Sequence, residues 1–338
     1  MSSDLSASGG RRLTYLRLSV TDLCNLRCRY CMPPDGVPKL RHHDILSYEE
    51  LLRLARVGAG LGLRKLRLTG GEPLVRRGLA GFIGRLRDEG LFSDLRLTTN
   101  GVLLPPLARE LKAAGLGGLN ISLDALDPVI FAEMAGRPGP AGEDLARRAW
   151  EGFQAALEYG FRTKINCVPI RGANDSQLVP LARLSLEHPV DVRFIEHMPI
   201  GPDGLWNQES FLSAGEVMTT LSRELGPLTP RAEAEPGAPA RLYTLPGARG
   251  SVGFISAVSE HFCGHCNRLR LTADGKLKPC LLTNREVDLR GPLRAGASDE
   301  ELRELFLAAA GQKPVSHLEK APEDLMADGR REMSRIGG

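Results

Sequence analysis

The fold of this chain is indicated first by residues 15–31, which read YLRLSVTDLCNLRCRYC. The opening run, 15–20, has the β-like character of a strand, and three cysteines follow on the loop after it. In parallel α/β folds this loop, at the carboxyl end of the strand, carries the chemistry. Cys24, Cys28 and Cys31 lie close enough in sequence to hold one iron–sulfur cube. Because a cube takes four ligands, one iron is left without a protein partner.

Alternating strand and helix signals continue along the chain. Five more β-like runs are expected as strands: 65–69, 95–99, 119–123, 163–169 and 191–197. Apolar residues at helical spacing predict helices at 48–61, 106–114, 145–159 and 177–187. The first helix opens with Ser47 and has Glu50 three residues later, the pattern of a capping box. Such repetition predicts parallel strands with right-handed crossovers, and six units fall short of the eight that close a standard barrel. We expect an α/β fold with an open sheet or a partial barrel.

The composition is that of an ordinary globular protein. Of 338 residues, 42% are hydrophobic and 25% are charged, which excludes a disordered tail or a small disulfide scaffold. The formal net charge of +3 is too small to predict a nucleic-acid partner. No stretch approaches the roughly 18 apolar residues of a membrane span, and residues 1–12 lack the apolar core of a signal peptide. Seven cysteines suit metal ligation in a cytoplasmic protein better than a disulfide framework.

The last third of the chain is organised differently. Residues 229–240, rich in Pro, Gly, Ala and Glu, predict a connector, and 241–245 with 251–256 predict a hairpin. A final helix is expected at about 299–310, before a polar tail whose plainest interpretation is a frayed terminus. We therefore expect three parts: a flexible N-terminus at 1–12, the barrel at 13–230, and a smaller α+β region at 231–338.

A second cysteine trio, Cys263, Cys266 and Cys280, again supplies three thiolates. If it holds a second cube, the open iron of that cube faces whatever binds in the barrel mouth. Alternation along the following run places Arg268 and Arg270 on one face of a strand. Two neighbouring guanidiniums suit an anion between them, and arginine is suited to bidentate phosphate contact. The adjacent cysteines favour a phosphate site over a solvated charged strand.

The first trio, with Tyr30 between its last two cysteines, resembles the motif of the radical S-adenosylmethionine (SAM) superfamily. In that superfamily SAM chelates the open iron, and an electron from the cluster cleaves SAM to a 5′-deoxyadenosyl radical. The segment TGGEP at 69–73 resembles the superfamily's GGEP segment. The resemblance implies five SAM contacts: Tyr30, Gly71, Glu72, Ser122 and Met198.

Over nearly its whole length the chain resembles the GTP 3′,8-cyclases of molybdenum cofactor (molybdopterin) biosynthesis. The matching segments are LSVTDLC at 18–24, RLTGGEP at 67–73, SLDALD at 122–127, FIEHMPIG at 194–201, the second trio and the final Gly-Gly. The resemblance implies a second 4Fe-4S cluster on Cys263, Cys266 and Cys280 that meets the guanine ring, and a tail, Gly337 and Gly338, that reaches the active site. The implied GTP contacts are Arg17, Arg67, Thr98, Lys164, Arg268, Leu269 and Arg270.

The same resemblance implies the reaction and its partners. The adenosyl radical removes hydrogen from C3′ of GTP, and the carbon radical attacks C8 of guanine to give 3′,8-cyclo-7,8-dihydro-GTP. No side chain is expected to act as an acid or base in this step. The expected partners are GTP, a low-potential electron donor such as flavodoxin or ferredoxin, and the next enzyme of the pathway, with no nucleic acid and no membrane, for a monomer or homodimer.

Two other functions stay open on the residues alone. A radical SAM enzyme acting on a peptide or another small molecule would use the same barrel, although peptide-modifying relatives usually carry a longer C-terminal cysteine array. A non-catalytic zinc-binding protein would complete the trios with His42 or His43 and with His261 or His265. Cys167 has no assigned role and is expected as a buried strand residue. The Gly- and Pro-rich run 136–142 is expected as a variable loop.

Overall fold

The computed structural model describes residues 5–7, 10–200, 206–231, 238–316, 331 and 333–337. The main element of these residues is one twelve-stranded sheet in the order β14-β13-β12-β3-β4-β5-β6-β7-β8-β11-β10-β9. Its centre is parallel throughout and follows chain order, as the sequence predicted. The six central strands are β3 (Tyr15–Ser19), β4 (Lys65–Thr69), β5 (Asp94–Thr99), β6 (Gly118–Ser122), β7 (Arg162–Cys167) and β8 (Asp191–Ile195).

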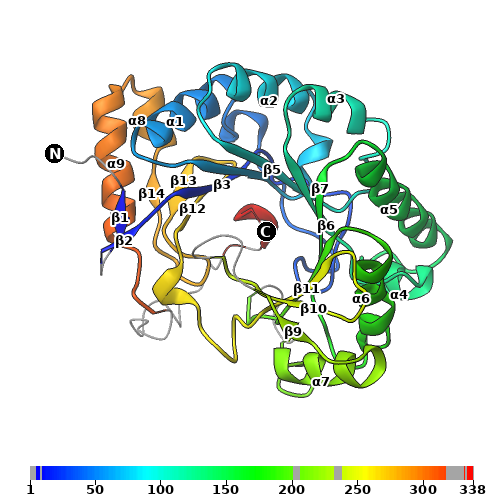
Figure 1. The fold of residues 1–338 in the computed structure, drawn as a ribbon. Coiled ribbons are helices and arrows are strands. Elements are labelled where there is room, and N and C mark those ends of the chain that lie inside the picture. The colour runs from blue at the N-terminus through cyan, green and yellow to red at the C-terminus, as the bar shows by residue number, and fades with distance from the viewer. Residues whose placement is uncertain are drawn as a thin grey trace.

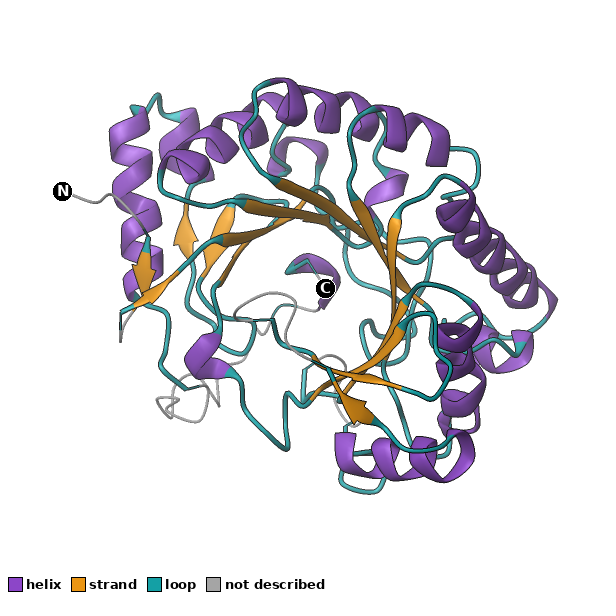
Figure 2. Cartoon of the chain, viewed as in Figure 1, coloured by secondary structure: helices purple, strands orange, loops and turns teal. Residues whose placement is uncertain are grey.

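Helices cover the outer face of this curled sheet (Figures 1 and 2). Along β3 and β4, Leu16 and Leu66 belong to the buried core, whereas the intervening Arg17 and Arg67 line a central cavity. The period-two alternation of a strand therefore separates an apolar outer face from a polar inner one. The covering helices are α1 (Tyr48–Gly60), α2 (Leu79–Asp88), α3 (Ala108–Ala113), α4 (Pro128–Met134), α5 (Pro140–Glu158) and α6 (Leu178–Glu187).

The predicted start of α1 is confirmed in detail. The amide of Glu50 donates to Ser47 Oγ at 3.1 Å, and the amide of Ser47 donates to Glu50 Oε2 at 2.7 Å. These two bonds satisfy amides that the first helical turn leaves without an intrahelical partner. The helix thus begins where its sequence signal places it.

Residues after β8 complete both edges of the same sheet. At one edge β11 (Ser251–Ile255) runs parallel to β8, and β10 (Arg241–Thr244) and β9 (Thr229–Pro230) follow it antiparallel. At the other edge β12 (Arg268–Leu271) runs parallel to β3 and is followed by β13 (Lys276–Lys278) and β14 (Val287–Asp288). The chain between β11 and β12 must therefore cross from one edge to the other, and it carries Cys263 and Cys266.

The remaining helices flank these edge strands. Between β8 and β9 lies α7 (Ala214–Leu225), and after β14 come α8 (Arg290–Arg294) and α9 (Asp299–Gly311). Short 3-10 turns are found at η1 (His42–Asp44), η2 (Pro73–Val75), η3 (Asp175–Gln177), η4 (Cys263–His265) and η5 (Met333–Arg335). No helix of the described residues has both the length and the apolar character needed to cross a bilayer.

Two local expectations differ from the structure. The helix expected from residue 145 begins at Pro140, because Gly139, with φ +86°, allows the turn that Pro140 then follows as the first helical residue. Part of the expected variable loop at 136–142 is therefore helical. The described residues of the N-terminus, expected to be flexible, form an antiparallel hairpin of β1 (Ser6–Ala7) and β2 (Arg11–Arg12) that contacts α9. The fully buried Leu5 gives this hairpin its apolar anchor.

Candidate active site

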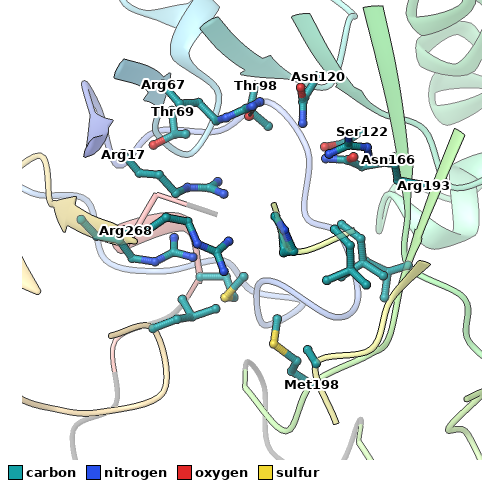
Figure 3. A pocket seen from close by; sticks show the side chains of 18 of the residues that line it. Arg17, Arg67, Thr69, Thr98, Asn120, Ser122, Asn166, Arg193, Met198 and Arg268 are labelled. Atoms are coloured by element: carbon teal, nitrogen blue, oxygen red, sulfur yellow. Dashed lines mark hydrogen bonds between the residues drawn. The ribbon is translucent and has the colours of Figure 1, made fainter. Parts of the chain in front are cut away.

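A cavity of about 400 Å³ lies inside the curled sheet, a size typical of small-molecule sites. It is lined by both cysteine trios and by inward-facing residues of β3 to β8 and β12. Figure 3 shows polar side chains facing this space from several strands. The sequence-predicted SAM and GTP contacts that line it are Arg17, Tyr30, Arg67, Gly71, Glu72, Thr98, Ser122, Lys164, Met198, Arg268 and Arg270.

The first trio lies on the loop after β3 as half-buried free thiols. The amide of Arg27 donates to the carbonyl of Ala135 at 2.9 Å, so this loop is tied to the end of α4. Burial raises the pKa of Cys24 to about 11 and that of Cys28 well above its usual value. Without a metal centre these cysteines stay protonated, whereas a bound metal centre favours their thiolate form, because the thiolate is the ligand. The donor set fits an iron–sulfur cube with one open iron.

In neither trio do the cysteine side chains lie as close together as the ligands of a single metal ion. Across the described ranges, no three His, Cys, Asp or Glu side chains gather tightly enough to hold one metal ion. The ligands of a four-iron cube bind separate corners and do not need to converge on one point. His265 is exposed, and His261 Nδ1 lies 3.3 Å from the carbonyl of Ala257. The arrangement therefore lends no support to the zinc sites considered from the sequence.

The GGEP segment packs directly on the cysteine loop. A Cβ on Gly71 would lie 2.3 Å from the carbonyl oxygen of Leu23, so only glycine permits this approach. The neighbouring Glu72 is buried, and burial raises its pKa to about 7. Its Oε1 accepts from Leu74 N and Thr99 Oγ1, and its Oε2 accepts from Asn100 N. Both carboxyl oxygens thus hold the loop that carries Gly71. The residue also lines the cavity.

Tyr30 is held by a buried carboxyl group. Its hydroxyl donates to Asp124 Oδ2 at 2.8 Å, and the amide of Val168 donates to Asp124 Oδ1 at 2.9 Å. Burial raises the pKa of Asp124 to about 6. The end of β6 therefore fixes the aromatic ring inside the first cysteine loop.

Arginines from three adjacent strands meet on one wall of the cavity. Arg270 of β12 pairs in register with Arg17 of β3, which pairs with Arg67 of β4. Burial and the neighbouring Arg268 lower the pKa of Arg270 to about 10, and burial and Arg270 lower that of Arg17. Although burial works against it, Arg67 and Arg17 lower the pKa of Tyr15 to about 8. The wall is strongly electropositive and suits a polyanion.

The opposite wall contains polar residues that the sequence analysis missed. Asn120, Asn166 and Arg193 line the cavity with Ser122 (Figure 3). The side-chain oxygens of both asparagines are buried and have no hydrogen-bond partner within the described residues. Lys164 Nζ and Arg193 each lie 3.4 Å from Asp191 Oδ2. The signal that could have found these residues is alternation, since each lies two residues from another inward-facing position.

Leu269 differs from the other predicted GTP contacts. It lies fully buried in the apolar core on the outer face of β12, between the two inward-facing arginines. The strand's pleat turns its side chain away from the cavity, so the contact with GTP that the resemblance implies for Leu269 stays a prediction for its main chain. Cys167 is fully buried at the end of β7, as expected, where Asn174 Nδ2 lies 3.6 Å from its sulfur.

The second trio faces the arginine wall. Cys263, Cys266 and Cys280 line the same cavity as half-buried free thiols. Although burial works against ionisation, Arg268 and Lys313 lower the pKa of Cys266 to about 6. This sulfur is therefore already prepared as an anionic ligand. Three cysteines beside a cation-rich wall are a donor set that a second cube would fit.

The C-terminal tail enters the cavity, as the resemblance implied. The carbonyl of Gly337 accepts from Arg17 at 2.9 Å and from Arg270 at 3.3 Å. Gly337 has φ +77°, and a Cβ there would lie 2.5 Å from Thr69 Oγ1. Only glycine suits this position. Gly338 lies outside the described residues.

Comparisons with known proteins agree with this geometry. Residues 18–185 match the radical SAM superfamily model, and residues 190–319 match the model described as Molybdenum Cofactor Synthesis C. The GTP 3′,8-cyclase of Pelotomaculum thermopropionicum is 47% identical over 332 residues, covering 97% of this chain and 98% of the relative. Those of Heliobacterium modesticaldum and Desulforamulus reducens are 46% and 45% identical, each over 329 residues and with the same coverage.

Solved structures extend the likeness to the fold. Streptococcus suis SuiB shares 13% identity with a TM-score of 0.59, covering 90% of this chain and 67% of SuiB. SuiB bound to S-adenosylmethionine gives 14% identity and a TM-score of 0.56, covering 87% of this chain and 68% of SuiB. At such identities the likeness concerns the fold alone.

Proposed function

The chain belongs to the GTP 3′,8-cyclase family of radical SAM enzymes, and on that premise we propose how its own residues perform the reaction. The family acts in molybdenum cofactor synthesis and uses a 4Fe-4S cluster with SAM. When bound, this pair supplies the one-electron chemistry that removes hydrogen from C3′ of GTP. We assign the cluster to Cys24, Cys28 and Cys31. The assigned SAM contacts are Tyr30, Gly71, Glu72, Ser122 and Met198.

The arginine wall binds the triphosphate of GTP. This assignment is supported most by the side-by-side register of Arg270, Arg17 and Arg67 on three neighbouring strands. A triphosphate carries about four negative charges, and each charge-assisted hydrogen bond contributes roughly 1.5–3 kcal/mol. Lys164 and Thr98 add contacts from β7 and β5. An anion here offsets the cost of burying several cations together.

The remaining chain positions the two reacting carbons of GTP. With the phosphates held at the arginine wall, the guanine ring extends toward the second trio, and C3′ is left facing the SAM side of the cavity. Such fixation is the main contribution a protein makes when a radical must react within one molecule. The tail, through Gly337, occupies the cavity beside Arg17 and limits the entry of water.

The second trio, Cys263, Cys266 and Cys280, holds a second 4Fe-4S cluster that contacts guanine. The lowered pKa of Cys266 and the shared cavity support this proposal. Each turnover needs two electrons: one cleaves SAM, and the second, with a proton, reduces the guanine-centred radical left when C3′ attacks C8. We propose an external one-electron donor of low potential, such as flavodoxin or ferredoxin, as their source. The product passes to the next enzyme of the pathway.

The test is an anaerobic assay of iron-reconstituted protein with SAM, dithionite and GTP. We expect release of 5′-deoxyadenosine that depends on GTP, together with a cyclised GTP product of unchanged mass identified by chromatography and mass spectrometry. Equal release with and without GTP, in protein shown to hold both clusters, would contradict GTP as the substrate. It would leave the assignment of the first trio standing.

A further inference from the structure

Lys313 is a buried lysine whose ammonium group contacts the second trio. The residue follows α9 and is only 3% exposed. Its Nζ donates to the carbonyl of Arg268 at 2.8 Å and to the carbonyl of Pro279 at 2.7 Å. The thiol of Cys266 is its third polar neighbour and acts on the ammonium. An ammonium has three N–H donors, so the two carbonyls use two of them and one is left for this sulfur.

The three acceptors are distributed over the whole second site. Cys266 is one proposed ligand, Pro279 immediately precedes the ligand Cys280, and Arg268 opens β12 at the arginine wall. One ammonium therefore ties two ligand segments to the start of the substrate-binding strand. Rotating or withdrawing Lys313 would release all three together.

The remaining ligand is tied to the same segment by Arg11 of the N-terminal hairpin. Its guanidinium donates to the carbonyl of Cys263 at 2.5 Å and to the carbonyl of Pro314 at 2.6 Å, with a weaker bond to that of Lys313 at 3.4 Å. The chain at 313–314 is thus the common anchor of all three second-trio cysteines.

A comparison with Lys278 shows that Lys313 is not an ordinary buried lysine. Lys278 is equally buried at 3%, and its ammonium lies 3.7 Å from the carboxylate of Glu286. The negative charges that act on Lys313 are the thiolates of Cys266 and Cys280, whereas on Lys278 the carboxylate of Glu286 acts more strongly than Cys280. Burying an ammonium is costly unless its charge is compensated. For Lys313 that compensation comes from the sulfur ligands.

We propose that Lys313 is a positioning residue for the second cluster, which orients Cys266 and the Cys280 segment and raises the cluster's reduction potential through its charge. This inference rests on the proposed second cluster. A positive charge and an N–H donor at a ligating sulfur stabilise the more negative, reduced form of a cluster. The same contact holds Arg268 where it meets the substrate.

The experiment begins with the iron content of the reconstituted wild-type chain. About eight irons per chain establish two clusters, whereas about four would overturn the second cluster itself. The variants are Lys313→Met, which keeps the length but loses all donors and the charge, and Lys313→Gln, which keeps two donors without the charge. Lys313→Arg keeps the charge, and Lys112→Met, which removes an ammonium that donates to the carbonyl of Gly160, is the control for losing a lysine outside the cavity.

Two readouts separate positioning from packing. Chelator-driven iron release should become roughly 10–100-fold faster for the second cluster of Lys313→Met, with the first cluster unchanged. A redox titration followed by electron paramagnetic resonance should place the second cluster of Lys313→Gln at a lower midpoint potential than wild type. Lys313→Arg should recover part of both properties, and Lys112→Met should match wild type in both.

The outcomes are distinguishable. Suppose that the wild type holds about eight irons and that Lys313→Met and Lys313→Gln keep its rate of iron release and its midpoint potential. This result overturns the role of Lys313 and leaves the cyclase assignment intact. If Lys313→Met does not fold, Lys313→Gln decides alone, because an unchanged potential in that variant excludes the charge effect.

Discussion

Replacing Gly337 with alanine tests the tail most directly, because the structure gives two separate reasons why the change should fail. Gly337 has φ +77°, a conformation that costs an L-residue about 1–2 kcal/mol. The new Cβ would also lie 2.5 Å from Thr69 Oγ1. Thr69 is buried at 2%, so relieving this contact resembles overpacking a core, at roughly 1–3 kcal/mol.

Together these effects weaken tail docking by about 2–5 kcal/mol, which is roughly 30-fold or more in its equilibrium. Docking places the Gly337 carbonyl on Arg17 and Arg270, so we expect Gly337→Ala to lower the rate of GTP cyclisation at least about tenfold. The assay is anaerobic product formation at saturating GTP and SAM, with iron per chain measured on the same sample. Both clusters should remain.

Two further variants divide this effect into its parts. Thr69→Ala combined with Gly337→Ala removes the nearest obstacle and leaves only the backbone strain, so part of the activity should return. Gly247→Ala is the matched control, because Gly247 has φ +73° with nothing within 4 Å of an added Cβ. A Gly337→Ala protein with full activity and intact clusters would refute the reasoning, since the tail would then not need this position.

Three other predictions concern the cavity and its supports. Arg270→Ala should raise the Kd for GTP about tenfold, from the loss of a charge-assisted contact of about 1.5 kcal/mol, while slow GTP-independent SAM cleavage persists; an unchanged Kd by equilibrium dialysis would remove Arg270 from the phosphate site. Gly71→Ala should deplete iron from the first cluster, because its Cβ would lie 2.3 Å from the Leu23 carbonyl, and this is read from iron per chain and SAM binding. Arg331→Met should expose the tail to limited proteolysis, because Arg331 donates to both oxygens of Asp274 at 3.0 and 2.9 Å; equal cleavage of variant and wild type would contradict this. Burial raises the pKa of Asp274, but hydrogen bonds from Thr272 and Arg331 outweigh burial and hold this pKa below its usual range. The stabilisation from the Arg331–Asp274 pair is therefore present above about pH 4 and is lost as the pH falls through the lowered pKa.

The centre of the sheet was predictable because each strand and helix carries its own local signal. Alternating residues such as Leu16, Arg17 and Leu18 show period two, and Ser47 with Glu50 marks a helix start without any tertiary information. The edges were predictable only in part: the hairpin expected at 241–245 and 251–256 is confirmed as β10 and β11, but its place beside β8 had no local signal. Nothing local in residues 268–271 indicates that β12 pairs with β3, because that register depends on a contact about 250 residues away.

The residues of the candidate site also differ in whether a local sequence pattern could reveal them. Cysteine spacing and the GGEP segment are local patterns, so they were found from the sequence. Arg193 and Asn120 were missed because alternation shows which residues share one face of a strand but not that this face lines a cavity. The resemblance named Leu269 as part of a segment, and only the structure shows that its side chain lies on the core face of the strand. Lys313 was not found because its carbonyl acceptors belong to Arg268 and Pro279, which lie 45 and 34 residues away in the sequence.

The incomplete barrel explains why two cysteine trios can serve one cavity. A closed eight-stranded barrel has an interior filled by side chains. Here the six central strands leave a gap, and the C-terminal strands extend both edges without joining them in the described residues. The segment from β11 to β12 has to cross that gap, so its cysteines are placed opposite the loop that carries the first trio. The space kept open between the two trios is what a ligand of nucleotide size requires, and Gly337 lies at its arginine wall.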